Sequence, residues 1–322
     1  MTALMVVLEH DRGEVPVGSL EALTAGRALA ADMGAPMEAV VVGDADLTAV
    51  AGEYGASAVH QVTNAMLSDY GPDAWGEAVA QLARSAAPAA VMAVGTDRGN
   101  EVMAQIAARL DLPFVANCLS IEPGDSWSMT RVQWGGSLLE DSTLTADIKL
   151  VSFAHHAVEA AAGGATTPSV TSFDADLDAS LAATVITDRV VLASGVTLST
   201  APVVVSGGRG VGSEDAFAPL EELAELLGGR VGCSRAVTNN GWRPHSDQVG
   251  QTGTRIAPEI YIACGISGAI QHWVGAMASK NILAINTDSD ANMVTKAGYA
   301  VIADLHEVVP AISAEIRRRR GE

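Results

Sequence analysis

The sequence has few cysteines and few positively charged residues. Its 322 residues include three cysteines, Cys118, Cys233 and Cys264, which lie far apart and form no CxxC motif. This spacing indicates neither a disulfide framework nor a zinc site. Lysine and arginine total 19 against 38 aspartates and glutamates, for a formal net charge of −19. Such an acidic excess argues against nonspecific binding to DNA, RNA or anionic lipid.

Long apolar runs are also missing. No window free of charge approaches the length of a membrane-spanning helix. The run Ala3–Leu8 is too short for a signal peptide and has no basic segment before it. We therefore expect a soluble, cytosolic protein without direct membrane insertion. The 16 arginines against three lysines fit either a salt-adapted cytosol or a GC-rich gene, and the sequence leaves both open.

Aromatic residues make up only 4% of the chain, so its cores must be built from alanine, valine, leucine and isoleucine. A hydrophobic content of 48% with 32 glycines is typical of a globular α/β protein. The chain is long enough for two domains, each with its own core.

The first half of the chain alternates between strand-like and helix-like segments. This rhythm predicts a mostly parallel sheet with helices on both faces. Ser19 is a plausible N-cap of the first helix, and Gly34 a plausible stop. The expected strands are Leu4–Leu8, Glu38–Val42, Ala58–Val62 and Ala89–Val94, and the expected helices are Ser19–Met33, Leu47–Tyr54, Ala74–Ser85 and Asn100–Leu110.

Between about Ser120 and Phe153 the pattern changes. The short alternating runs Ser128–Trp134 and Thr143–Val151 predict antiparallel strands packed on that sheet. The segment Val158–Thr187 is rich in small residues with little periodicity, so we expect an extended excursion and a linker.

Near residue 200 the strand–helix rhythm starts again. It predicts a second parallel, doubly wound sheet, and hence an N-terminal domain over residues 1–190 and a C-terminal domain over 200–322. The expected strands are Val203–Val205, Gly229–Cys233, Tyr261–Ala263, Ile282–Ile285 and Ala300–Ala303, and the expected helices are Phe217–Leu227, Gly268–Ser279 and His306–Arg320.

A glycine-rich loop, Gly208-Arg-Gly-Val-Gly212, follows the first strand of this second half. It is not a GxGxxG dinucleotide fingerprint, because Ser213 stands where the last glycine is needed. A phosphate loop and a simple tight turn both remain open. Arg209 would place a cation where a pyrophosphate could lie.

Two further segments carry polar groups. Ser234-Arg235 follows a strand, at the edge where α/β sheets bind ligands, although a surface ion pair is an equal alternative. The loop Gln248–Gly253 has two glycines that allow close backbone approach, and Gln251 and Thr252 offer an amide and a hydroxyl. A plain polar turn is the alternative for this loop.

Three more strand ends carry polar residues. Ser267, Gln271 and His272 follow Cys264-Gly265 at an expected helix start, where backbone N–H groups favour an anionic group. Asn286 and Asp304 each come just past a strand, and either could simply cap a turn. With the earlier loops, polar residues then stand at the carboxyl ends of five strands, as a bound dinucleotide requires.

Other reactive motifs are lacking. The pair His155-His156 has no nearby carboxylate or third ligand in the sequence, so we expect no metal site. No GxSxG, Walker A, HExxH or EF-hand motif occurs. The polar loops offer donors but no strong base or nucleophile, which favours cofactor binding over catalysis.

Taken together, these residues closely resemble the α subunit of electron transfer flavoproteins (the FixB family). The N-terminal half is similar less specifically, through Val7-Leu-Glu-His10 and Gly95–Leu110. The resemblance rests on seven ordered segments: Gly208-Arg-Gly210, Ser234-Arg-Ala236, Gln248-Val-Gly-Gln-Thr-Gly253, Pro258-Glu-Ile-Tyr261, Gly265-Ile-Ser-Gly-Ala-Ile-Gln-His272, Ala284-Ile-Asn286 and Ala303-Asp-Leu305.

The resemblance implies FAD bound by the C-terminal domain. Three residues would tune the flavin: Arg235 over the ring, Thr252 near N5 and His272 near the O2 carbonyl. The full set implied to bind the cofactor is Arg209, Ser234, Arg235, Gln248, Val249, Gly250, Gln251, Thr252, Gly265, Ser267, Gly268, Ala269, Ile270, Gln271, His272, Asn286, Asp304 and Leu305. Of these, Ser267–Gln271 would hold the ribityl and pyrophosphate groups, and Asn286, Asp304 and Leu305 would surround the adenosine.

The resemblance also implies a redox carrier rather than an enzyme. The family works as a heterodimer with a β subunit that commonly carries AMP. FAD would take electrons from dehydrogenases, such as acyl-CoA dehydrogenases, and pass them to a quinone oxidoreductase. Two alternatives stay open: a bifurcating protein that oxidises NADH with a second flavin, and an adenine-nucleotide-binding module without redox work. Arg131–Gly136 and Phe153–His156 depart from the family pattern.

Overall fold

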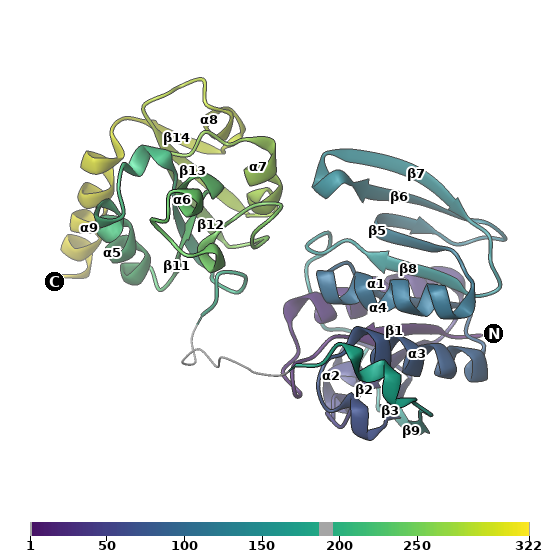
Figure 1. Cartoon of the computed structure of the whole chain (residues 1–322). Helices are drawn as coiled ribbons and strands as arrows, with labels where there is room; N and C mark the ends of the chain where they lie inside the picture. Colours follow the sequence, from purple (N-terminus) through teal and green to yellow (C-terminus); the bar gives the residue numbers. More distant parts are fainter. Residues whose placement is uncertain (1, 187–195, 322) are drawn as a thin grey trace. The chain divides into compact units, whose positions relative to one another are not determined.

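Figure 1 shows the computed structural model, which describes residues 2–186 and 196–321. The chain divides into two compact units, Met1–Val190 and Val191–Glu322. Each unit is an α/β layer structure with a mostly parallel sheet between helices, so the predicted fold class is confirmed. Within the described ranges, no helix has the length and apolar character needed to cross a membrane. Thr187, at the end of the predicted linker, lies outside the described residues.

The sheet of the first unit has nine strands in the order β7-β6-β5-β8-β4-β1-β2-β3-β9. All neighbouring pairs are parallel except β5–β6 and β6–β7. The strands are β1 (Leu4–Leu8), β2 (Met37–Val42), β3 (Ala58–Thr63), β4 (Ala90–Val94), β5 (Phe114–Glu122), β6 (Trp127–Gln133), β7 (Leu138–Leu144), β8 (Lys149–Phe153) and β9 (Ser169–Asp174).

Helices cover both faces of this sheet. The interior strand β1 is buried on both sides, with Leu4, Val6 and Leu8 in one hydrophobic cluster and Met5 and Val7 in the other. A strand between two helical layers must be apolar at every position, which explains its continuous aliphatic sequence. The first cluster includes residues of α1 (Val17–Met33) and α2 (Thr48–Glu53), and the second includes residues of α3 (Pro72–Ala86) and α4 (Asp97–Leu110). Short 3-10 turns occupy Ala65–Leu67, Trp134–Gly136 and Ala179–Ala183.

The predicted position of the antiparallel strands in residues 120–153 is wrong. The antiparallel strands β6 and β7 are not packed on the sheet but extend its edge through hydrogen bonds to β5. The run Thr143–Val151 covers the end of β7 and the start of β8, and β8 lies parallel between β4 and β5. Alternation along a strand reveals which side chains share a face but not which strand is the neighbour. For the same reason the predicted linker does not reveal β9, which pairs with β3 at the other edge.

Ser19 is not the N-cap of α1. The helix begins at Val17 after Pro16, whose φ of −69° is compatible with a helix start, and no side chain caps it. Ser19 is buried, and its hydroxyl donates to the Glu9 carbonyl (2.8 Å) and accepts from the Glu9 N–H (2.9 Å). The prediction that the helix stops at Gly34 is confirmed, with φ +61° at this glycine.

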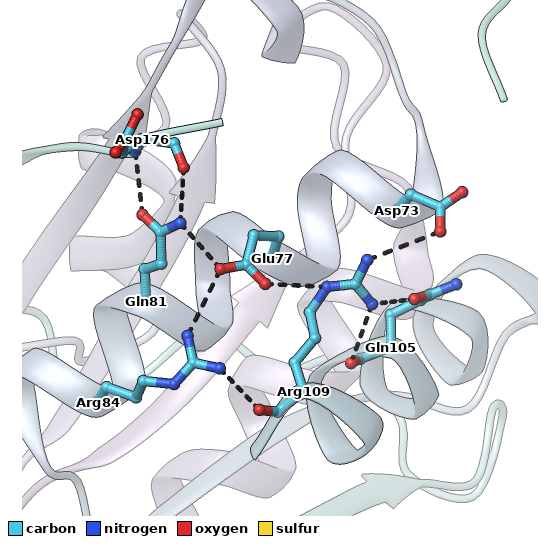
Figure 2. A network of polar contacts seen from close by, with 7 residues as sticks. All are labelled: Asp73, Glu77, Gln81, Arg84, Gln105, Arg109 and Asp176. Carbon is cyan, nitrogen blue, oxygen red and sulfur yellow. Dashed lines mark hydrogen bonds and ion pairs between the residues drawn. The ribbon is translucent and has the colours of Figure 1, made fainter. Parts of the chain in front are cut away.

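Helices α3 and α4 pack against each other and share a polar network (Figure 2). Arg109 of α4 pairs with Glu77 (3.0 Å) and Asp73 (3.7 Å) of α3. Gln81 extends the network to the backbone of Asp176, which follows β9. The close approach depends on Gly76, because a Cβ atom there would lie 2.3 Å from the Cβ of Gln105.

The second unit has a five-stranded, fully parallel sheet in the order β11-β10-β12-β13-β14. In chain order this is 2-1-3-4-5, the predicted doubly wound arrangement, and its switch point lies between β10 and β12. The strands are β10 (Val203–Gly207), β11 (Arg230–Cys233), β12 (Ile260–Cys264), β13 (Asn281–Asn286) and β14 (Tyr299–Ile302).

The helices of this unit again separate onto two faces. One hydrophobic cluster joins α5 (Ala218–Leu226) and α9 (Leu305–Arg320) to the sheet. The other includes residues of α7 (Ile270–Ala276) and α8 (Asn292–Lys296). A short helix, α6 (Arg235–Asn239), follows β11, and 3-10 turns occupy Arg209–Val211, Asp215–Phe217 and His245–Asp247.

The contact at Gly76 generates a stability prediction. Alanine is the better helix former by about 1 kcal/mol, so propensity alone predicts that Gly76→Ala stabilises the protein. The clash with Gln105 predicts the opposite, because overpacking costs roughly 1–3 kcal/mol. We expect the packing cost to exceed the gain in helix propensity, with a net loss of about 1 kcal/mol and at most about 2 kcal/mol in the free energy of unfolding, measured by urea denaturation. The control Ser85→Ala, at an exposed position of α3, should cause no loss. A Gly76→Ala variant more stable than the wild type would contradict the close contact between the two helices.

Candidate functional site

The parallel strands of the second sheet place all their carboxyl ends along one edge. We refer to the segments at this edge as the carboxyl rim. It comprises residues 208–212 after β10, 234–235 after β11, 248–254 beside the end of β11, 265–272 after β12, 286 at the end of β13, and 304–305 after β14. Every residue predicted to bind the cofactor lies in one of these segments.

At the switch point, two loops pack backbone against backbone. The N–H of Gly208 donates to the Cys264 carbonyl (2.8 Å), and that of Gly210 donates to the Gly265 carbonyl (3.2 Å). A Cβ atom on Gly208 would lie 2.2 Å from the Gly265 oxygen, and Gly265 itself has φ +61°. Only glycines allow this approach. Arg209 lies between them on the 3-10 turn and is exposed at the rim.

The side chain of Gln248 fixes the loop Gln248–Thr254 through hydrogen bonds, and this residue is only 2% exposed. Its side-chain oxygen accepts from the Thr238 hydroxyl (2.9 Å), and its amide donates to the Thr252 hydroxyl oxygen (3.0 Å). Arg235 donates to the same oxygen at 3.4 Å. Thr252 thus accepts twice, and no acceptor for its own proton lies among the described residues. The exposed Thr252 hydroxyl is therefore free to donate to a ligand.

The same loop packs tightly on the start of α7. The Gln251 N–H donates to the Gln271 carbonyl (2.7 Å), and Gly250, with φ +146°, faces that carbonyl. A Cβ atom on Gly275 would lie 2.3 Å from the Gly250 nitrogen. The loop and the helix that carries His272 therefore form one assembly. Val249 is buried in the core (1% exposed), so only its backbone could contact a ligand.

His272 is a buried, neutral imidazole. It is 7% exposed, and burial lowers its pKa to about 4. Its Nε2 lies 2.7 Å from the hydroxyl of Tyr261, a fully buried residue of β12 whose pKa is raised by burial. Its Nδ1 is buried and forms no hydrogen bond of good geometry with a described residue, although the backbone of Val249 lies close enough to oppose the lowering of its pKa. A buried ring nitrogen without a partner is costly, and a bound polar group could satisfy it.

The predicted helix over Gly268–Ser279 is shorter than expected. It begins at Ile270, because Gly265 and Gly268 both have positive φ and keep the preceding segment out of the helix, and it ends at Ala276. Ser267 and Ala269 therefore lie on an extended approach to the helix. Ser267, Ala269, Ile270 and Gln271 are all exposed at the rim.

The remaining predicted residues have structural roles in this chain. Asn286 donates to the Ile266 carbonyl (3.1 Å) and accepts from the Asp288 N–H (3.1 Å). Asp304 caps α9 by accepting from the His306 N–H (2.9 Å), and Leu305 is buried against Gly265. Ser234 precedes α6 without a side-chain cap. Each still lies at the rim, and the exposed Asp304 carboxylate retains acceptor capacity.

Sequence reasoning does not identify two supports of the site, Tyr261 and Thr238. The strand pattern alone makes Tyr261 an ordinary strand residue, although a tyrosine in an aliphatic buried strand needs a hydrogen-bond partner. That requirement is the available signal. Thr238 gives no signal, since its contact with Gln248 depends on the path of the chain between them.

The prediction that His155-His156 has no carboxylate nearby is wrong. Glu21 of α1 lies 3.0 Å from His156 Nδ1 and 3.9 Å from His155 Nε2. Glu21 and His156 are 135 positions apart in the chain, so spacing along the sequence could not reveal the contact.

Comparison with known proteins agrees with the geometry. Residues 4–178 match the family described as electron transfer flavoprotein domain, and residues 197–277 match the electron transfer flavoprotein FAD-binding domain. The chain is 34% identical to the electron transfer flavoprotein subunit alpha of Thermoanaerobacterium thermosaccharolyticum, with 98% of each chain covered. It is 36% identical to the subunit of the same name from Mycobacterium leprae, with 100% of each chain covered. It is 34% identical to the protein FixB of Clostridium saccharobutylicum, over 97% of this chain and 95% of that one.

The first match spans more than half of the chain, and the relatives align along nearly all of it. The second match, to an FAD-binding domain, covers most of the carboxyl rim and supports FAD as the cofactor. The chain therefore belongs to the electron transfer flavoprotein α-subunit family, whose members are electron carriers.

Proposed function

We propose that this chain binds FAD at the carboxyl rim and carries electrons as one half of a heterodimer with a β subunit. The observation that carries the proposal is the convergence of five parallel strand ends on a rim with unsatisfied polar groups. Glycine loops let the backbone approach a ligand, and Thr252 and His272 each have hydrogen-bonding capacity that the protein leaves unused.

The rim also supplies positive charge in a strongly acidic protein. Arg209 and Arg235 are exposed at the rim, and in the described part of the chain neither forms an ion pair. With a net charge of −19, the protein offers many carboxylates that could have paired with them. Two unpaired guanidinium groups suit a pyrophosphate and a ring that becomes negatively charged on reduction.

When bound, FAD would supply the ring that accepts and releases electrons. Around it, Arg235 provides a fixed cation and Thr252 a hydroxyl donor, both held in place before any electron arrives. His272 offers an uncharged imidazole as a hydrogen-bonding group, because burial keeps it uncharged near pH 7. Arg209 and the segment Ser267–Gln271 would hold the ribityl and pyrophosphate groups, and Asn286, Asp304 and Leu305 would surround the adenosine.

The partners in this proposal follow from family membership. The β subunit would carry AMP, the donors would be dehydrogenases such as acyl-CoA dehydrogenases, and the acceptor would be a quinone oxidoreductase. A carrier that serves several partners must bind them weakly, through small surfaces.

The direct test is to co-express this chain with its β subunit and to purify the complex. We expect a yellow complex with one FAD per heterodimer, counted by absorbance after release of the cofactor. A complex that holds no flavin after reconstitution with FAD would refute the proposal. Two FAD per heterodimer, both reduced by NADH, would instead indicate the bifurcating alternative.

Replacing Arg235 should make the bound flavin harder to reduce. In Arg235→Ala the ring loses a cation that favours added negative charge. We expect the midpoint potential to fall by roughly 60 mV, which for one electron corresponds to about 1.4 kcal/mol. Arg318→Ala is the control, because it removes the same charge from the exposed end of α9. Equal shifts in the two variants would show that net charge, not the rim position, sets the potential.

The buried His272 should make the second unit acid-sensitive. The unfolded chain protonates this residue near its ordinary pKa of about 6.5, whereas the folded chain does so only near pH 4. Between these values the unfolded state binds more protons, so the free energy of unfolding falls as the pH falls, by up to ~3 kcal/mol in total.

In His272→Gln this loss between pH 6.5 and pH 4 should largely disappear. Urea denaturation at a series of pH values measures the difference between variant and wild type. His306→Gln, at an exposed position of α9, should keep the wild-type pH dependence. An unchanged pH dependence in His272→Gln would show that another group is responsible.

A further inference from the structure

A second cluster of polar side chains lies in the first unit and has no part in the carboxyl rim. It consists of Glu21 on α1 and the adjacent His155 and His156, which follow β8. The cluster is well enclosed, since the exposed fractions of these side chains are 6%, 20% and 11%. Within residues 2–186 and 196–321, this is the one group of three or more His, Cys, Asp or Glu residues whose potential ligand atoms all lie within 4.8 Å of one another.

The ligand atoms are spaced almost as a metal ion would require. His156 Nδ1 lies 3.0 Å from one oxygen of Glu21, and His155 Nε2 lies 3.9 Å from the other. Zinc bonds to nitrogen and oxygen are about 2.0–2.2 Å, so two ligands of one tetrahedral ion lie roughly 3.3 Å apart. The potential ligand atoms all lie within 4.8 Å of one another, and because the two rings are stacked, at least one imidazole must rotate before both nitrogens can face one ion.

Helix α1 has a glycine at the position where it faces His155. Gly18 of α1 faces His155, and a Cβ atom there would lie 3.3 Å from His155 Nε2. The two rings stack with their centroids 3.6 Å apart. His156 has φ +63°, which lets its backbone N–H donate to Glu21 (2.8 Å) while its ring lies beside the same carboxylate.

The charge of Glu21 also calls for a cation. The residue is only 4% exposed, and no lysine or arginine pairs with it within the described ranges. Buried carboxylates are normally paired with a cation or coordinate a metal.

We propose that Glu21, His155 and His156 form a binding site for a zinc-class divalent metal ion. Two imidazoles and a carboxylate suit this borderline class better than Mg²⁺ or Ca²⁺, which prefer oxygen ligands. The ion would neutralise Glu21 and fasten the turn after β8 to α1, with a fourth position left for water. The proposal is independent of flavin binding, because these residues lie in the first unit.

The chain's thiols offer little competition for the ion. Cys118, Cys233 and Cys264 are all buried, and burial raises the pKa of each thiol to about 12. They are therefore protonated near pH 7, and a metal binds the thiolate form.

The experiment is a Co²⁺ titration of the untagged, full-length chain after treatment with a chelator, followed by visible absorption and calorimetry. We expect one Co²⁺ per chain, displaced by Zn²⁺, and a higher melting temperature with either ion. His155→Ala and Glu21→Gln should each weaken binding by roughly 100-fold or more. The matched control is His60→Ala, because His60 also contacts a glutamate, Glu38 (2.6 Å), but has no second histidine beside it.

A second measurement does not depend on the folding of any variant. In ¹⁵N spectra of the wild-type chain, Zn²⁺ should shift the ring nitrogens of His155 and His156 but leave those of His60 unchanged. The proposal is overturned if the folded wild type binds neither ion. It is equally overturned if the ring signals of His155 and His156 do not move, or if folded His155→Ala binds as tightly as the wild type.

Discussion

The parallel pairing of β10 with β12 is the constraint on which the candidate site depends. It sets the carboxyl ends of these two strands side by side, the other parallel pairs add three more ends to the same edge, and the loops that leave β10 and β12 touch through Gly208, Gly210 and Gly265. A side chain at any of these glycines would separate the loops. The rim is therefore a consequence of backbone packing, and the polar side chains are placed by it.

Burial determines which side chains of the rim carry a charge. His272 is enclosed with Tyr261 and loses its charge, so it can act only through neutral hydrogen bonding. Arg209 and Arg235 stay in contact with solvent and keep theirs. A guanidinium group remains charged at any physiological pH, whereas an imidazole does so only when water or an anion stabilises it. This division gives the rim a fixed positive charge that does not vary with pH.

Much of the secondary structure could be predicted from residue patterns. The strands at Leu4–Leu8 and Ile260–Cys264 are short apolar runs, and Gly34 ends the first helix as its backbone freedom suggests. Two of the failures occurred where a choice depended on distant residues. The β6–β7 hairpin could equally have packed on the sheet or extended it. Ser19 is buried and donates a hydrogen bond to the Glu9 carbonyl instead of capping the helix.

The sequence by itself determined the alternation of strands and helices, the positions of the glycine loops and the kinds of chemical group at each strand end. These are local properties, set by the preferences of neighbouring residues. Only the tertiary structure decided which groups meet: Thr252 with Arg235, His272 with Tyr261, and Glu21 with His156. Such pairs form because packing the two faces of each sheet brings distant segments together, and no local pattern encodes that distance.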